Sequence, residues 1–200
     1  MPSIAITGCI GSGKTVTLEH LAAVLPNATT YCADKENRSL LNNDPEVKEL
    51  IRMNFGKSYF DASDNTDRKQ LFNLISSNPT AKTILEEILH PRLEMTWKPL
   101  AQKFKGDKHS FFIAEIPLLY EKGLEAFFDR TILVACSNPI RQERLFRNRS
   151  LSREEISAWL KNQLPEEEKI PLADHILWND SSREILEQQI NLLCQLLKTT

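Results

Sequence analysis

The sequence predicts an α/β fold in which a five-stranded parallel sheet lies between two layers of helices. Short apolar runs alternate with longer helical patterns along the 200 residues, as in a three-layer α/β/α protein. Several runs are apolar at consecutive positions, which is typical of strands that helices cover on both faces. A glycine-rich turn, GCIGSGKT, joins the first run to the first helical pattern. With 41% hydrophobic residues, the chain is suited to one domain over residues 1–200.

The predicted strands are five short apolar runs. They lie at 4–7, 29–32, 111–116, 131–136 and 175–178. Two longer segments break the alternation of strands and helices. The segment over about 34–105 is mostly helical, and the segment over about 139–172 is strongly charged. We expect both segments to be additions to the sheet.

The predicted helices are marked by apolar residues on one face and by capping residues at their starts. After the glycine-rich turn, Leu18, Leu21 and Leu25 share a face, and Pro26 ends the pattern. Predicted N-caps are Asp44, Asn78 and Asn138, each followed by Pro, and Ser152 and Ser181, each with Glu three residues later. The last helix carries a core-facing stripe of Ile185, Leu186, Ile190, Leu193 and Leu197.

The turn GCIGSGKT matches the P-loop motif G-x-x-x-x-G-K-[ST] at every fixed position, with a strand before it and a helix after it. Its glycines let backbone N–H groups point at phosphate oxygens, and the helix that starts near Lys14 adds the positive end of its dipole. Lys14 can reach the β- and γ-phosphates, and the Thr15 hydroxyl can bind Mg²⁺. The motif therefore predicts a bound nucleoside triphosphate and leaves the acceptor of the phosphate open.

A kinase needs more than this loop. It needs a group that orients the acceptor hydroxyl, arginines that neutralise the phosphates in transit, and a lid that excludes water. A GTPase would instead need a guanine-reading motif such as N-K-x-D, which the sequence lacks.

Asp34 is the candidate for orienting the acceptor. It follows the second predicted strand, and ligands of open α/β sheets bind at the carboxyl ends of strands. A carboxylate there can orient a hydroxyl, accept its proton or hold Mg²⁺ through water. It can also cap the helix that DKENRSLL predicts, and the two roles are compatible.

The charged segment NPIRQERLFRNRSLSR is the candidate lid, because it has five arginines and no lysine. The planar fork of Arg suits phosphate oxygens, whereas a solvated helix face would not need arginine alone. A solvated face remains the alternative interpretation. A further candidate is the stretch HPR, because Pro91 is expected to end or kink a helix there and so to aim His90 and Arg92 away from its face. Its alternative is surface charge at a kink.

Taken together, these stretches resemble the dephospho-CoA kinase family over nearly the whole chain and in the family's order. The stretches are ITGCIGSGKT, CAD ending at Asp34, FG, DRKQL, LHPRL, EIPLLYEKGLEAFFD, RQERLFRNR and ADHILWND. The P-loop is generic. The combination of PLL-[FY]-E with the spaced Q-x-x-R-L-x-x-R is far more specific.

The resemblance implies a P-loop nucleotide-kinase core with a helical substrate-binding lobe over about 34–105 and a lid over about 139–172. It implies that ATP, with Mg²⁺ at Thr15, phosphorylates the ribose 3′-hydroxyl of dephospho-CoA to give coenzyme A and ADP. The catalytic residues that it implies are Asp34, Lys14 and Arg144. The ATP-binding residues that it implies are Gly11, Ser12, Gly13, Lys14, Thr15, Val16, Arg149 and Asn179, the last near the adenine. The acceptor-binding residues that it implies are Asp34, His90, Arg92, Leu118, Leu119 and Tyr120.

The sequence departs from the family pattern at a few positions. Cys32 stands where the family has the first Asp of D-A-D, so an auxiliary Mg²⁺ ligand is missing there. Val16 replaces the usual Ser or Thr, although Thr15 keeps the metal-binding hydroxyl. The bulky Trp178 precedes Asn179 and can alter the adenine contact. Glu115 ends a predicted strand and could imitate a Walker B acid, which makes it a secondary candidate.

Other functions stay open at this point. The chain could be another P-loop kinase, such as one similar to uridine or shikimate kinases, or a regulator that binds ATP without transferring phosphate. The net charge of −2 predicts no general attraction to nucleic acid or anionic membranes, and the four cysteines have no zinc-site spacing. No signal-peptide or membrane-spanning pattern is visible. We therefore expect a cytoplasmic protein that acts on small molecules, and the sequence sets no oligomeric state.

Overall fold

The structure is a computed structural model that describes residues 3–106, 110–149 and 163–199. The chain divides into two compact units. The first is Met1–Cys32 with Lys98–Thr200, and it contains the sheet. The second is Ala33–Trp97, and it is helical. The predicted α/β class is confirmed.

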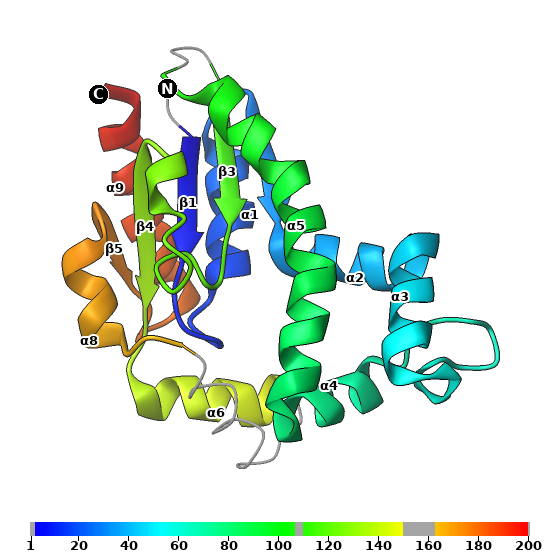
Figure 1. The fold of residues 1–200 in the computed structure, drawn as a ribbon. Helices are drawn as coiled ribbons and strands as arrows, with labels where there is room; N and C mark the ends of the chain where they lie inside the picture. The colour runs from blue at the N-terminus through cyan, green and yellow to red at the C-terminus, as the bar shows by residue number, and fades with distance from the viewer. Residues whose placement is uncertain (1–2, 107–109, 150–162, 200) are drawn as a thin grey trace. The chain divides into compact units, whose positions relative to one another are not determined.

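The first unit is built on a five-stranded sheet of order β2-β3-β1-β4-β5, in which all neighbouring strands are parallel. The strands are β1 (Ser3–Thr7), β2 (Ala28–Cys32), β3 (Phe111–Glu115), β4 (Arg130–Ala135) and β5 (His175–Trp178). Each lies within one residue of its predicted bounds. Figure 1 shows β1, β3 and β4 running in the same direction. All carboxyl ends therefore meet at one edge of the sheet, where the P-loop follows β1.

Helices cover both faces of this sheet. On one face, α1 (Lys14–Val24) and α9 (Arg183–Thr199) pack on alternate strand residues such as Ile4 and Ile6. On the other face, Phe112 lies between Phe104, at the end of α5 (Pro79–Phe104), and Phe128, with ring centroids 5.9 and 6.5 Å apart. The α9 stripe is buried as predicted at Leu186, Ile190, Leu193 and Leu197. Ile185 is the exception, with 42% of its surface exposed.

The first unit contains four further elements that the structure describes. They are η2 (Glu125–Phe127), α6 (Asn138–Arg149), α8 (Glu166–Lys169) and η3 (Ile170–Leu172). Asn138 lies inside α6, and its side chain accepts a bond from the Arg141 guanidinium at 3.1 Å rather than from a backbone N–H. The helix α9 begins at Arg183, one residue later than a cap at Ser181 would place it. The cap predicted at Ser152 lies outside the described residues.

The second unit contains α2 (Ala33–Asn43), α3 (Pro45–Phe55), η1 (Lys57–Tyr59), α4 (Arg68–Ser77) and most of α5. It has its own apolar core of Leu41, Val47, Ile51, Leu71, Leu85, Ile88 and Leu89. Asp44 caps α3 as predicted, because its carboxylate accepts the N–H groups of Glu46 and Val47 at 2.9 and 3.0 Å. No described helix, in this unit or the other, is both long and apolar enough to cross a membrane.

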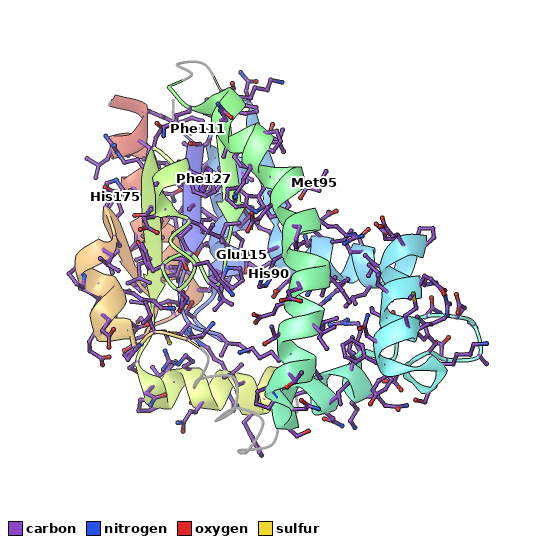
Figure 2. The ribbon with its side chains drawn as sticks, viewed as in Figure 1. His90, Met95, Phe111, Glu115, Phe127 and His175 are labelled. Carbon is purple, nitrogen blue, oxygen red and sulfur yellow. The ribbon has the colours of Figure 1, made fainter. Side chains whose placement is uncertain are left out.

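Helix α5 continues through Pro91, so of the two outcomes expected at the HPR stretch, an end or a kink, the helix end is excluded. Pro91 lacks a backbone N–H, and the helix nevertheless runs for 26 residues. Figure 2 shows His90 midway along α5. Arg92 folds back on its own helix, where Nη1 donates to the Ile88 carbonyl at 2.8 Å and Nη2 lies 3.0 Å from Glu46 Oε1. Arg92 is thus held by its own unit.

Candidate active site

The P-loop leaves β1 and closes at the first turn of α1. Gly13 has φ 102°, a left-handed conformation, and a Cβ there would lie 2.4 Å from Asn179 Nδ2. A Cβ on Gly8 would lie 2.4 Å from the Val134 carbonyl oxygen. Both positions therefore require glycine. The first turn of α1, which the structure describes fully, contains no acidic residue, so the positive end of the helix dipole is available to an anion.

The Lys14 side chain is folded against the loop that precedes it. Its Nζ donates to the carbonyl oxygens of Gly8 and Cys9 at 3.0 and 3.2 Å, and the side chain is buried. These bonds fix the ammonium group beside the loop backbone. The positive charge that the motif requires for phosphate binding is therefore already at the loop.

Two side chains, one from the first turn of α1 and one from the end of β2, donate to one carboxylate at the end of β3. Glu115 Oε2 accepts the Thr15 hydroxyl at 3.0 Å and the Cys32 thiol at 3.3 Å, and Glu115 is buried. Strand register places Glu115 beside Cys32 of β2 and beside Ile6 of β1, and from β1 the P-loop leads to Thr15. Figure 2 shows Glu115 at the opposite end of β3 from Phe111. Glu115, which the sequence indicates only as a secondary candidate, thus contacts both the P-loop residue Thr15 and Cys32.

The Thr15–Glu115 pair fits a magnesium ion. A hydroxyl and a carboxylate supply the hard oxygen ligands that Mg²⁺ prefers, and this ion usually keeps further ligands from water and substrate phosphates. The described residues contain no group of three or more His, Cys, Asp or Glu that could hold a metal by itself. The pair therefore suits an ion that arrives with a nucleotide.

Asn179 connects the end of β5 to the P-loop and to α6. Its Nδ2 donates to the Ser12 carbonyl at 2.7 Å, and its Oδ1 accepts from Arg144 Nη2 at 3.4 Å. Arg144 Nη1 also donates to Cys136 Sγ at 3.4 Å. Burial raises the pKa of the Cys136 thiol to about 11, so the thiol is neutral at physiological pH. Arg144 is therefore held beside the P-loop by neutral groups, and its charge is not cancelled by them.

Residues at the start of α6 also shape the loop. A Cβ on Gly11 would lie 3.1 Å from Arg141 Cγ, so α6 packs directly on the P-loop. Arg141 is buried with its Nη1 3.7 Å from Glu166 Oε2, which accepts the Cys136 N–H at 3.0 Å. Burial raises the pKa of Glu166, and the nearby Arg141 opposes that shift. No local pattern in the sequence indicates this pair, because only the fold brings α6 and α8 together.

Comparison with known proteins assigns the chain to a family. The family described as dephospho-CoA kinase matches residues 3–184. The chain belongs to the dephospho-CoA kinase family. A dephospho-CoA kinase from Fusobacterium nucleatum is 31% identical over 192 residues, which cover 96% of each chain.

Solved structures agree with this family. A crystal structure from Thermus thermophilus has a TM-score of 0.74 and 31% identity, covering 97% of this chain and 96% of the other. A dephospho-CoA kinase from Campylobacter jejuni has a TM-score of 0.65 and 25% identity, covering 99% of this chain and 98% of the other. The resemblance inferred from the sequence is confirmed.

The residues of the dephospho-CoA kinase pattern that lie in the first unit differ from one another in how deeply they are buried. Ser12 is fully buried in the P-loop, and Val16 packs against the core of the sheet. After β3, Leu118 is half-buried, Tyr120 is buried and Leu119 has 0% of its surface exposed. Arg149 ends α6, and its side chain lies outside the described part of the chain.

The other expected residues of the dephospho-CoA kinase pattern belong to the second unit. Asp34 is exposed in the first turn of α2, directly after the end of β2. It is therefore inside the helix and is not its N-cap, and an acidic residue in a first turn favours the helix dipole. His90 and Arg92 lie on α5. The structure thus joins Lys14, Thr15, Arg144 and Asn179 in the first unit, and places the expected acceptor residues Asp34, His90 and Arg92 in the second.

Proposed function

We propose that this chain transfers the γ-phosphate of ATP to the ribose 3′-hydroxyl of dephospho-CoA, giving coenzyme A and ADP. The observation that carries this proposal is the family match over residues 3–184. Within this range the P-loop leads into α1, as a phosphate-binding loop does. Lys14 and the N-terminus of α1 would hold the phosphates of ATP. Thr15 and Glu115 would hold Mg²⁺, which supplies positive charge to the phosphates.

Two arginines are proposed to stabilise the phosphoryl group during transfer. Phosphoryl transfer spreads negative charge over three oxygens, and positioned cations are the main protein contribution. Arg144 already lies beside the P-loop through its bonds to Asn179 and Cys136. Arg149 lies five residues further along α6, in the segment 139–172 that we propose as a lid. Asn179, besides its bond to Ser12, is proposed to border the adenine.

Asp34 is proposed to orient the acceptor hydroxyl. It follows the carboxyl end of β2 directly, which is where ligands bind in open α/β sheets. Because the transition state is largely dissociative, the alignment of the hydroxyl matters more than full removal of its proton. His90 and Arg92 on α5 are proposed to bind the acceptor, and so are Leu118, Leu119 and Tyr120 after β3. The segment 34–105 would then be the substrate-binding lobe.

A panel of acceptors tests this proposal. The purified protein is mixed with Mg-ATP and dephospho-CoA, uridine, shikimate or no acceptor, and ADP is followed. We expect ADP well above the no-acceptor rate only with dephospho-CoA. ADP at the no-acceptor rate with dephospho-CoA would rule the proposal out. A second acceptor that is preferred would favour another P-loop kinase, and ATP binding without any turnover would favour a regulator.

The role of Asp34 has a matched control in the same helical turn. Asp34→Asn is expected to lower kcat while leaving ATP binding intact. Glu36→Gln removes the other first-turn acid of α2 and is expected to leave kcat near wild type. Equal activity of wild type and Asp34→Asn would remove Asp34 from the mechanism.

A further inference from the structure

A short segment before and within α8 contacts the P-loop. Gln163 Oε1 accepts the backbone N–H of Ile10 at 3.0 Å. The next residue, Leu164, donates its N–H to Glu121 Oε1 at 2.8 Å. Lys169 Nζ lies 2.7 Å from the same Glu121 oxygen. One continuous set of contacts therefore runs from the P-loop through Gln163 and Leu164 to the Glu121–Lys169 pair.

The ion pair at the far end of this set is buried. The Lys169 side chain has 0% of its surface exposed and that of Glu121 has 12%. Buried charges are tolerated when they are paired and further hydrogen-bonded, and the Leu164 N–H supplies such a bond. Because moving either partner would leave a buried charge unpaired, the pair fixes the backbone at Leu164. It thereby fixes the backbone position from which the Gln163 side chain extends.

The other end of the set is a peptide of the phosphate-binding loop. Ile10 is buried, and its N–H lies between Gly8 and Gly13, where the loop backbone turns. Such a loop binds phosphate only while its successive N–H groups keep their directions. An external acceptor on one of these peptides limits how the neighbouring peptides can rotate.

We propose that Gln163 is a positioning residue that holds the P-loop in its phosphate-binding conformation, and that the Glu121–Lys169 pair holds Gln163. The proposal rests on the proposed function only in taking ATP as the ligand of the loop. Gln163 itself touches the loop backbone and acts on ATP through it. The ion pair acts one step further away, because Glu121 reaches the loop through the Leu164 backbone and Gln163.

The test compares two substitutions at Gln163. Gln163→Met keeps the length of the side chain and removes the acceptor, whereas Gln163→Glu keeps an oxygen at the same place. We expect the Kd for ATP, measured by calorimetry without acceptor, to rise about 5- to 50-fold in Gln163→Met. We expect Gln163→Glu to stay within about 3-fold of wild type. The KM for dephospho-CoA is expected to be unchanged in both.

Two results would overturn the proposal. The first is an unchanged Kd for ATP in Gln163→Met. The second is an equal loss in Gln163→Met and Gln163→Glu, because Gln163→Glu retains the acceptor oxygen and loss of the hydrogen bond would then not explain the effect. Gln102→Met, an exposed substitution on α5, is the matched control and is expected to bind ATP like wild type. Since ATP binding is measured alone, this test does not depend on the identity of the acceptor.

The role of the ion pair is tested with both partners replaced together. Glu121→Leu with Lys169→Met removes both charges, and apolar replacement of a whole buried pair is usually tolerated. We expect the Kd for ATP to rise as in Gln163→Met. Adding Gln163→Met to this double variant is expected to change the Kd by less than about 3-fold more, because both act on one path. Fully additive effects would show that the pair does not act through Gln163.

Discussion

Gly13→Ala is the substitution whose cost follows most directly from the geometry of the P-loop. A left-handed residue other than glycine costs about 1–2 kcal/mol. The new Cβ would also lie 2.4 Å from Asn179 Nδ2 and would displace the amide that donates to the Ser12 carbonyl. Loss of a bond to a buried carbonyl costs about 1–3 kcal/mol. The free energy of unfolding should therefore fall by about 2–5 kcal/mol.

A double-mutant cycle separates the two contributions. In an Asn179→Ala background the clash is absent, so Gly13→Ala should cost only the backbone strain of about 1–2 kcal/mol. Gly123→Ala is the matched control, because Gly123 has φ 62° and a Cβ added there would meet nothing within 4 Å, so it should cost about the same. Urea unfolding of wild type and these variants measures the values. Equal costs of Gly13→Ala in both backgrounds would refute the role assigned to Asn179.

Three further outcomes are expected. Glu115→Gln should raise the Mg²⁺ concentration for half-maximal turnover about 10-fold, since the carboxylate bonded to Thr15 is lost; an unchanged Mg²⁺ titration would contradict this. Arg144→Ala should lower kcat by about 100-fold or more, whereas the exposed Arg147→Ala should not; equal kcat values would count against Arg144. Because the Cys136 thiol has a pKa raised to about 11 by burial, the folded state keeps a proton that the unfolded chain loses. Between about pH 9 and 11 the free energy of unfolding should fall by up to about 2 kcal/mol more in wild type than in Cys136→Ala, and parallel pH curves would refute this.

The fold and the P-loop were predictable because their signals are local. Each strand is a short apolar run, and several are apolar at consecutive positions, as expected where helices cover both faces of a sheet. The P-loop is recognised from glycines such as Gly8 and Gly13, which lie only a few residues apart. The Asp44 cap is equally local. The continuation of α5 through Pro91 was not predictable, because it depends on bonds along the whole helix outweighing one missing N–H. The exposure of Ile185 also depends on how α9 rotates against the sheet.

The partners of the site residues could not be predicted from spacing. Asn179 bonds to Ser12, which lies 167 positions away, and nothing in ADHILWND indicates that bond. Glu115 lies beside Cys32 because of strand register, and it bonds to Thr15 because the P-loop leads from the neighbouring β1 into α1. The Gln163–Ile10 contact depends in the same way on the return of the chain from α6 to α8. The sequence identified the residue types, and tertiary packing decided what they touch.

The proposed function centres on one bond, between the γ-phosphate of ATP and the ribose 3′-oxygen of dephospho-CoA. ³¹P NMR of the product formed from Mg-ATP and dephospho-CoA observes that bond directly. The account predicts a new 3′-phosphomonoester signal that grows in step with ADP and is lost with Asp34→Asn. Inorganic phosphate as the only new signal, or a phosphomonoester at another hydroxyl, would contradict it.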